Sequence, residues 1–134
     1  MLGAVRVYLV RHAEAAPGEP DELRTLTSHG RSQARELGAR LAAEPQRPDI
    51  VLTSPLLRAR ETGEEVARAT GAPSVPDERL EPGATASDLR EVVAGRGSTV
   101  VVVGHQPDCG RIAAELTGGP EPPFPAAGMV LIEV

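Results

Sequence analysis

The segment TVVVV at residues 99–103, followed by Gly104 and His105, decides the fold class. Four consecutive valines cannot alternate between a buried and an exposed face, so both faces of this predicted strand must be covered. Strands of this kind are typical of parallel sheets that lie between helices. We therefore expect a sheet with helices on both faces.

Further strands and helices alternate along the chain around that segment. Apolar runs predict strands, and apolar residues at helical spacing predict helices. The predicted strands are residues 5–10, 49–53, 74–75, 99–103 and 129–134, and the predicted helices are residues 28–44, 56–70, 87–94 and 107–117. This order predicts an α/β fold with three layers, an open and mostly parallel sheet between two layers of helices.

Ser87 is the expected N-cap of the third predicted helix, and three further residues are expected to mark helix ends. Ser28 is a candidate N-cap, and Pro107 occupies the expected first helical position of the last helix. Gly71 is a plausible C-cap, because glycine adopts the left-handed conformation that often ends a helix.

Length and composition limit the classes of function. The chain has 134 residues and a mass of 14.0 kDa, which predicts one domain over residues 1–134. All 14 basic residues are arginine, so the Schiff-base chemistry and P-loop phosphate binding that depend on a lysine amine are excluded. The aromatic residues are Tyr8 and Phe124, and the formal net charge is −5. We therefore expect no nucleic-acid partner, since neither a stacking platform nor a basic field is present.

The N-terminal segment and the cysteine content indicate a compartment. Arg6 and Arg11 interrupt the first apolar run, which therefore does not resemble a signal peptide. No apolar stretch has the length of a membrane span. Cys109 is the single cysteine and is expected to be a small buried residue. These features predict a cytoplasmic protein without a membrane partner, which we expect to be monomeric, and the lysine-free, alanine-rich composition suggests a bacterial source.

Charged and imidazole side chains follow three of the predicted strands. Arg11 and His12 come after the first strand, the segment 54–58 with Arg58 after the second, and His105 after the fourth. In open α/β sheets, ligands bind beyond the carboxyl ends of the strands. We therefore expect two arginines and two histidines to converge at one edge of the sheet.

Three motifs in the chain carry a family resemblance. LVRHAEA at residues 9–15, SPLLRARET at 54–62 and VVGHQP at 102–107 together resemble the histidine phosphatase superfamily, which includes the phosphoglycerate mutases. The resemblance covers nearly the whole chain, and it is greatest to the short SixA-type phosphohistidine phosphatases. It implies a phosphoglycerate mutase-like fold and a phosphatase that works through a phosphohistidine intermediate without a metal or other cofactor.

The resemblance also implies roles for four side chains. His12 is implied as the nucleophile, and Arg11, Arg58 and His105 as the residues that hold the phosphoryl group. The chemistry agrees, because a neutral imidazole can attack phosphorus and two guanidinium groups can bind phosphate oxygens in a bidentate manner. The alternative for each histidine is a structural residue bonded to a neighbour. Gly104 is expected to permit a sharp turn that places His105 over the crevice.

The general acid and the substrate are less well defined. In mutase-like relatives a carboxylic acid protonates the leaving oxygen, and Glu81 in RLEPG is the nearest match; its alternative is an ordinary surface glutamate. Arg24, with the acidic residues at 19, 21 and 22, could line the entrance and bind substrate, or lie in a solvated loop. A phosphohistidine substrate needs a protein acid less, because its leaving imidazole already carries a proton.

Other interpretations remain open at this point. The expected partner is a phosphate-bearing substrate, first of all a phosphohistidine protein and second a small phosphate monoester. The chain could instead be a non-catalytic module that binds phosphate or a phosphoprotein. His12-Ala13-Glu14 spells the H-x-E of some zinc enzymes, but the cysteine pair of those sites is absent. Ser54 is interpreted as strand-end turn chemistry, and His29 as a surface residue at a helix start.

Overall fold

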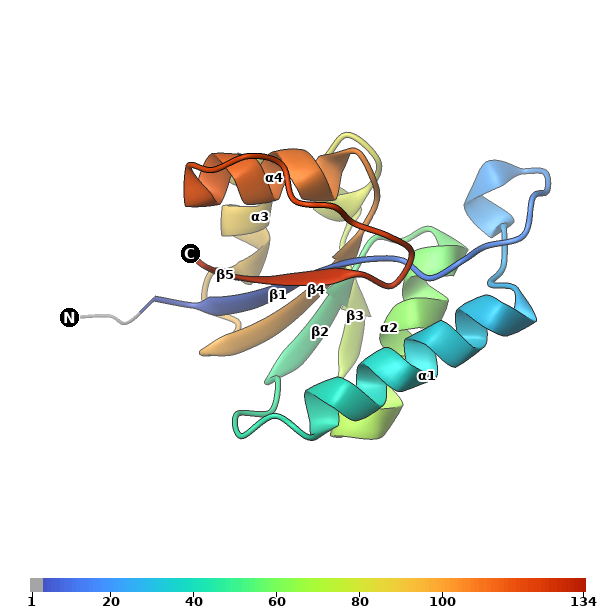
Figure 1. Ribbon diagram of the computed structural model, residues 1–134, viewed down its shortest axis with the longest axis horizontal. Coiled ribbons are helices and arrows are strands. Elements are labelled where there is room, and N and C mark those ends of the chain that lie inside the picture. Colours follow the sequence, from blue (N-terminus) through green and yellow to red (C-terminus); the bar gives the residue numbers. More distant parts are fainter. Residues whose placement is uncertain (1–3) are drawn as a thin grey trace.

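The computed structural model describes residues 4–134, which form five strands, four α-helices and two short 3₁₀ helices, labelled η (Figure 1). In chain order the elements are β1 (Arg6–Arg11), η1 (Asp21–Leu23), α1 (Ser28–Ala42), β2 (Ile50–Thr53), α2 (Leu57–Thr70), β3 (Ser74–Pro76), η2 (Glu78–Leu80), α3 (Ala86–Val93), β4 (Thr99–Gly104), α4 (Asp108–Thr117) and β5 (Met129–Glu133). Every predicted strand and helix is present, with ends that differ by a few residues. No helix within the described part of the chain is long and apolar enough to cross a membrane.

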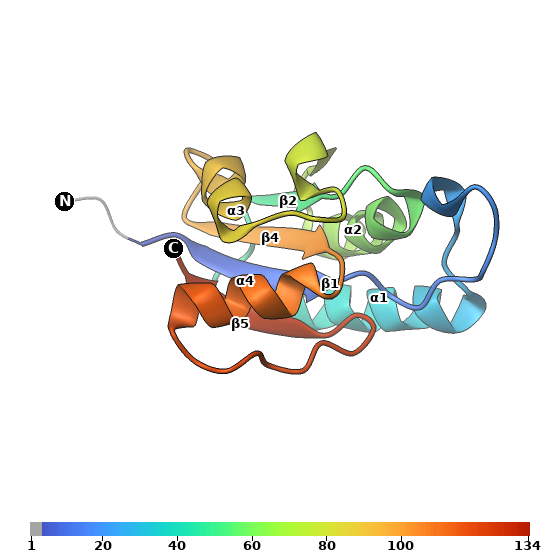
Figure 2. The ribbon, with the colours of Figure 1, turned by 90° about the horizontal axis from the view of Figure 1, so that it is seen from above.

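The strands form one sheet in the order β3-β2-β4-β1-β5. β2 pairs in parallel with β3 and β4, and β4 pairs in parallel with β1. β5 is antiparallel to β1 and closes the sheet on one side. Helices α1 and α2 cover one face and α3 and α4 the other, as two perpendicular views show (Figures 1 and 2). The predicted fold class, a mostly parallel sheet between two helical layers, is confirmed.

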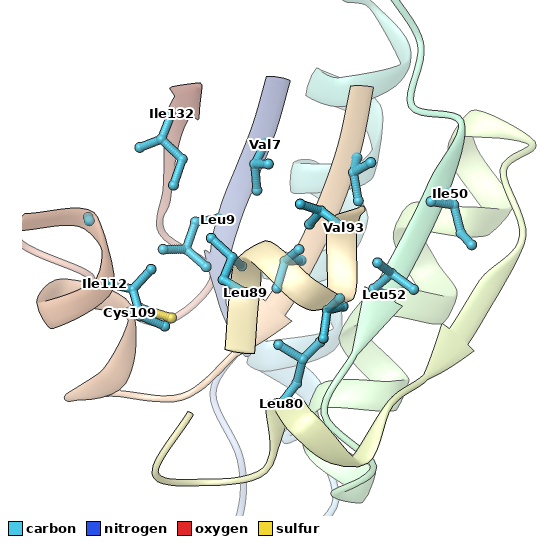
Figure 3. Packing of buried hydrophobic residues seen from close by; sticks show 14 of the residues in the cluster. Val7, Leu9, Ile50, Leu52, Leu80, Leu89, Val93, Cys109, Ile112 and Ile132 are labelled. Atoms are coloured by element: carbon cyan, nitrogen blue, oxygen red, sulfur yellow. The ribbon is translucent and has the colours of Figure 1, made fainter. Parts of the chain in front are cut away.

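The valine run of β4 explains why both faces carry helices. Val100 and Val102 belong to the core cluster under α3 and α4. Figure 3 shows Leu89 and Ile112 of the same cluster. Val101 and Val103 point the other way, into the core under α1 and α2. All four side chains are at most 1% exposed. Each buried valine contributes roughly 1.5–3 kcal/mol relative to an exposed one, so neither face can be left in water.

The predicted N-cap Ser87 is wrong, because α3 begins at Ala86 and the side chain of Thr85 caps it by accepting the N–H of Asp88. Of the other three predicted helix-end residues, two are shifted by one position. The side chain of Thr27, not Ser28, accepts the N–H of Gly30 and caps α1, so Ser28 is the first helical residue. Pro107 precedes the first turn of α4 instead of entering it. Gly71 ends α2 in the left-handed conformation with φ 82°, as predicted. Adjacent hydroxyl residues make the N-cap ambiguous in sequence, whereas a lone glycine after a helix is not ambiguous.

The register of the parallel strands brings their carboxyl ends together. Arg11 pairs with Gly104 and Thr53 with Val103. The backbone continues this alignment by one residue, because the His12 N–H donates to the Gly104 carbonyl and the Ser54 N–H to the Val103 carbonyl, both at 3.0 Å. The residues that follow β1, β2 and β4 therefore lie at one edge of the sheet.

Candidate active site

His12 lies directly after β1 and is held as a neutral imidazole. Its Nδ1 lies 2.8 Å from the carbonyl oxygen of Ala13. A carbonyl oxygen can only accept a hydrogen bond, so Nδ1 carries the ring proton and Nε2 keeps its lone pair. The pKa of His12 is lowered to about 4, mainly by burial and also by the positive charges of Arg58, Arg11 and Arg24, against the opposing bond to Ala13. At neutral pH the ring therefore has a free nucleophilic nitrogen.

Two guanidinium groups flank this imidazole. Arg58 is in the first turn of α2 and is 6% exposed. It donates from Nη1 to the backbone oxygen of Asp21 at 2.9 Å and from Nη2 to the Asp21 carboxylate at 3.2 Å. Arg11 donates from Nη1 to the carbonyl of Phe124 at 2.9 Å. Within residues 4–134 the buried Nε atoms of both arginines have no partner, so each group has an N–H left to donate to an anion.

The helix α2 is packed closely against β2, which fixes the position of Arg58. A Cβ atom added to Gly63 would lie only 2.4 Å from a methyl carbon of Thr53, so a larger residue would displace the helix from the strand. The hydroxyl of Thr62, which is fully buried, donates to the carbonyl of Arg58 at 2.8 Å and accepts the N–H of Ala13 at 3.0 Å. Thr62 therefore ties the turn that carries Arg58 to the residue next to the candidate nucleophile.

His105 follows β4 and faces His12. The two ring centroids are 5.3 Å apart, with the planes inclined by 60°. His105 is 4% exposed, and its Nε2 lies 2.7 Å from the hydroxyl oxygen of Ser54. Its pKa is lowered to about 3, mainly by burial and also by the charges of His12 and Arg58. The site thus holds two neutral imidazoles between two permanent cations.

Gly104 does not have the role that the sequence suggested for it. Its φ lies outside the left-handed region, and an added Cβ would make only an ordinary contact, 3.7 Å from the sulfur of Cys109. The backbone therefore reaches His105 without a turn that requires glycine, which is a correction. Cys109 is buried as predicted, and burial raises the pKa of its thiol to about 12. The thiol is consequently unsuited to nucleophilic chemistry.

Of the six candidate site residues, the structure brings Arg11, His12, Arg58 and His105 together and places Arg24 near them. Arg24 donates from Nε to the carbonyl of Ala16 at 2.9 Å and from Nη1 to the Asp21 carboxylate at 3.1 Å.

Glu81, the sixth candidate, lies in an exposed position directly after η2. The charges that shift the pKa values of His12 and His105 come from Arg11, Arg24, Arg58 and Asp21 and, for His105, also from His12; Glu81 is not among them. Its role as an acid stays a prediction.

An entrance loop, residues 14–27, carries polar groups whose separate roles could not be distinguished from the sequence. It lies beyond the carboxyl ends of the strands (Figures 1 and 2). Asp21 in this loop accepts hydrogen bonds from both Arg24 and Arg58, and these hold the pKa of its carboxyl below the usual value, with the Arg24 bond the largest cause. Asp21 is therefore an ionised acceptor and not a proton donor at neutral pH.

The entrance loop is fastened to α2 by Glu61. The Glu61 carboxylate accepts the N–H of Leu26 and the hydroxyl of Thr25, each at 2.8 Å, and pairs with Arg31 at 3.1 Å. Glu61 comes three residues after Arg58, so one helix supplies both a site arginine and the anchor of the loop. The loop and the sheet edge are thereby held in one arrangement.

Two histidine-based alternatives can be compared with the structure. His29 is exposed, as predicted, and its Nε2 lies 3.9 Å from the carboxylate of Glu14. That carboxylate belongs to the H-x-E sequence that begins at His12, but its nearest imidazole partner is on α1. Across residues 4–134 no group of three or more histidine, cysteine, aspartate or glutamate side chains is arranged to hold a metal ion.

Comparison with known proteins gives concordant matches. The sequence profile of the histidine phosphatase superfamily (branch 1) matches residues 7–82. Phosphohistidine phosphatase SixA of Escherichia coli (strain K12) is 32% identical over 127 residues, which cover 90% of this chain and 79% of SixA.

Solved structures agree with the sequence match. The structure of the protein histidine phosphatase SixA complexed with tungstate is similar with a TM-score of 0.85 at 28% identity, and the match covers 95% of this chain and 86% of that one. Bacillus stearothermophilus YhfR is similar with a TM-score of 0.73 at 25% identity, over 98% of this chain and 92% of that one.

Proposed function

The chain belongs to the histidine phosphatase superfamily, and from this premise we propose that it hydrolyses phosphohistidine on a protein, with His12 as the nucleophile. Arg11, Arg58 and His105 bind the phosphoryl group, and Arg24 lies at the entrance. The observation that carries the proposal is the bond from His12 Nδ1 to the Ala13 carbonyl, because it leaves the lone pair of Nε2 available. The similarity to SixA supports a phosphohistidine substrate.

In the first step, Nε2 of His12 attacks the phosphorus atom of the substrate. A bond forms between Nε2 and phosphorus while the bond between phosphorus and the substrate imidazole nitrogen breaks. The substrate imidazole keeps the proton on its other nitrogen and leaves as a neutral molecule. His12 keeps its own proton on Nδ1, bonded to Ala13, so phosphoryl transfer needs no net proton movement.

In the second step, water attacks the phosphorus atom of the enzyme intermediate. The new bond between oxygen and phosphorus replaces the bond to Nε2, and both hydrogens of the water leave with dihydrogen phosphate, which then equilibrates with the solvent. His12 returns to its neutral form. Arg11 and Arg58 stabilise the charge on the transferred oxygens in both steps, and their donors are already positioned before the reaction.

The nature of the leaving group separates phosphohistidine from a phosphate monoester. An alkoxide leaving group requires a proton, which a carboxylic acid usually supplies. Asp21 is ionised by its contacts with Arg24 and Arg58, and Glu81 is exposed. These features favour the phosphoramidate substrate over a monoester.

The remaining parts of the proposal concern the setting. We infer one catalytic domain over residues 1–134 that needs no metal or other cofactor and acts as a monomer in the bacterial cytoplasm, without a nucleic-acid or membrane partner. The chain has a single cysteine, which is buried and unpaired, and this supports a reducing compartment.

The test uses a histidine-containing phosphotransfer protein that has been chemically phosphorylated with phosphoramidate. Purified wild-type protein in EDTA is expected to release inorganic phosphate from it, and to do so faster than from p-nitrophenyl phosphate. His12→Ala is expected to lose turnover by more than about 1,000-fold while its circular dichroism is unchanged, because the removed side chain is a nucleophile at the sheet edge. Release of phosphate at the wild-type rate by this variant would overturn the proposal.

Two additions make the test specific. His29→Ala removes an exposed histidine on α1 and is the matched control, which should keep wild-type activity. Rapid quenching with labelled substrate should trap an acid-labile, alkali-stable label on the peptide that contains His12. Phosphate binding without turnover would support the non-catalytic module, faster monoester hydrolysis that Glu81→Gln abolishes would support the monoesterase, and loss of activity in EDTA would support a metal enzyme.

A further inference from the structure

Ser54 is a fully buried hydroxyl between the two strands that carry the site. It follows β2, is 0% exposed, and its oxygen lies 2.7 Å from Nε2 of His105 on the neighbouring strand β4. The same oxygen accepts the backbone N–H of Leu56 at 3.2 Å. The second bond is the strand-end turn that the sequence suggested, whereas the first joins residues 51 positions apart and could not be read from the sequence.

The hydrogen count at this hydroxyl distinguishes the two neutral tautomers of His105. A serine hydroxyl has one hydrogen and two lone pairs, and the Leu56 N–H uses one lone pair. If Nε2 of His105 carried the proton, it would use the second lone pair, and the hydroxyl hydrogen would need a third partner. Ser54 has no such partner in the described part of the chain. If the hydroxyl hydrogen points to Nε2 instead, both contacts of Ser54 are satisfied.

The second arrangement places the ring proton of His105 on Nδ1. That atom is buried and has no hydrogen-bond partner within residues 4–134. Four other buried side-chain atoms share this condition, and two of them are the Nε atoms of Arg11 and Arg58. Three unpaired nitrogens therefore belong to the residues that surround His12. A buried unpaired donor is costly, and a phosphoryl oxygen is an acceptor that all three could share.

We propose that Ser54 is a positioning residue that donates its hydroxyl hydrogen to Nε2 of His105 and so fixes the tautomer with the proton on Nδ1. His105 then donates from Nδ1 to an oxygen of the phosphoryl group held at His12. The role of His105 toward phosphate rests on the proposed function, but the tautomer does not. The two histidines thus have the same tautomer for different reasons, since Nδ1 of His12 bonds to a carbonyl and Nε2 of His105 accepts from a hydroxyl.

The tautomer can be read without turnover, by long-range ¹H–¹⁵N correlation spectra of the protein labelled in its three histidines. At pH 7 the His105 ring should show a protonated Nδ1 and an unprotonated Nε2. Addition of tungstate as a phosphate mimic should shift the Nδ1–H resonance of His105. A proton on Nε2 in the wild-type protein would overturn the proposal directly, whether or not any variant folds.

Substitutions of Ser54 test whether the tautomer of His105 affects the rate of the reaction. Ser54→Ala should transfer part of the His105 proton to Nε2 and lower kcat by about 10- to 100-fold, by analogy with the loss seen when the outer partner of a metal-binding histidine is removed. Ser54→Thr keeps the hydroxyl and should restore both the tautomer and most of the rate. An unchanged tautomer in Ser54→Ala would overturn the proposal, because a merely structural serine would affect stability and leave the proton on Nδ1.

The same experiments separate this proposal from the proposed function. If the protein has the Nδ1–H tautomer and Ser54→Ala changes it, but no substrate is turned over, the function fails and the role of Ser54 in fixing the tautomer stands. If turnover is present and the wild-type tautomer is Nε2–H, the function stands and the role of Ser54 fails.

Discussion

The sheet edge and the entrance loop both hold charged groups near His12, but they hold them in different ways. At the sheet edge, Arg58 and His105 are 6% and 4% exposed and bond to groups on neighbouring elements. In the entrance loop, the side chains of Arg24 and Asp21 are 28% and 59% exposed. Buried groups that are positioned before the substrate arrives can stabilise a transition state strongly, whereas exposed ion pairs contribute little. Substitutions should therefore have large effects at the edge and small effects in the loop.

The largest effect is expected for Arg58→Lys at the sheet edge. Lysine keeps the charge but presents a single ammonium in place of the planar fork that binds two phosphate oxygens. Removing one such donor from a preorganised site costs about 100- to 1,000-fold in rate. We expect kcat/KM for the phosphohistidine protein to fall by this factor, measured by phosphate release, with an unchanged circular dichroism spectrum.

Arg60→Lys is the matched control for that experiment, since Arg60 is exposed and lies two residues further along the same helix. Its activity should remain within about twofold of wild type, as for surface substitutions in general. If Arg58→Lys and Arg60→Lys had similar small effects, the difference between a preorganised edge and an exposed surface would not hold.

The sheet edge and the entrance loop also differ in how much of their structure could be predicted from the sequence. Arg11, His12 and His105 come directly after predicted strands, so the rule for parallel sheets was sufficient to bring them together. Arg58 was predictable because its helix begins just after a strand.

The other contacts depend on residues that are distant in sequence. The bond between Asp21 and Arg58 spans 37 positions, and the bond between Thr62 and Ala13 spans 49. No local pattern distinguishes Asp21 from the other acidic residues of its loop. Asp21 contacts Arg58 only because η1 packs against α2 in the folded chain. Likewise, Ser54 was predictable as a turn residue and not as the partner of His105, since only the pairing of β2 with β4 brings them together.

An effect of intermediate size, on the free energy of unfolding, is expected when the pH is lowered through the range in which His12 and His105 titrate. Burial holds the pKa of His12 at about 4 and that of His105 at about 3, both below the ordinary value of 6.5. As pH falls below 6.5, the unfolded chain takes up protons at these histidines that the folded protein does not, so the free energy of unfolding must decrease. The contribution of the two neutral histidines to the free energy of unfolding is fully present above pH 6.5 and is lost progressively toward pH 3–4.

Urea unfolding at several pH values between 6.5 and 4.5 measures this loss. The window is above the range in which carboxyls with lowered pKa values, such as Asp21 and Glu61, begin to be protonated in the folded protein. His105→Gln replaces one of the two histidines with a group that does not titrate, so its stability should depend less steeply on pH than that of wild type. An equal slope in both proteins would show that His105 is not held neutral by burial.

The smallest effect is expected for Asp21→Asn in the entrance loop. Asparagine keeps the size of the side chain and leaves the bond from Arg58 to the backbone oxygen of residue 21 in place. It removes the negative charge that Arg24 and Arg58 share, so both arginines become more available to an anion. A single exposed charge removed near a bound phosphate should strengthen phosphate binding by about three- to fivefold at low salt, and by less as salt screens the interaction. Isothermal titration with inorganic phosphate at two salt concentrations measures both quantities.

Glu22→Gln is the matched control, because it removes the same charge from the next residue, which has no ion pair in the described structure. Weaker phosphate binding in Asp21→Asn, or a loss of activity as large as that of Arg58→Lys, would mean that the loop carboxylate is part of the preorganised site and does not compete with the substrate for Arg58.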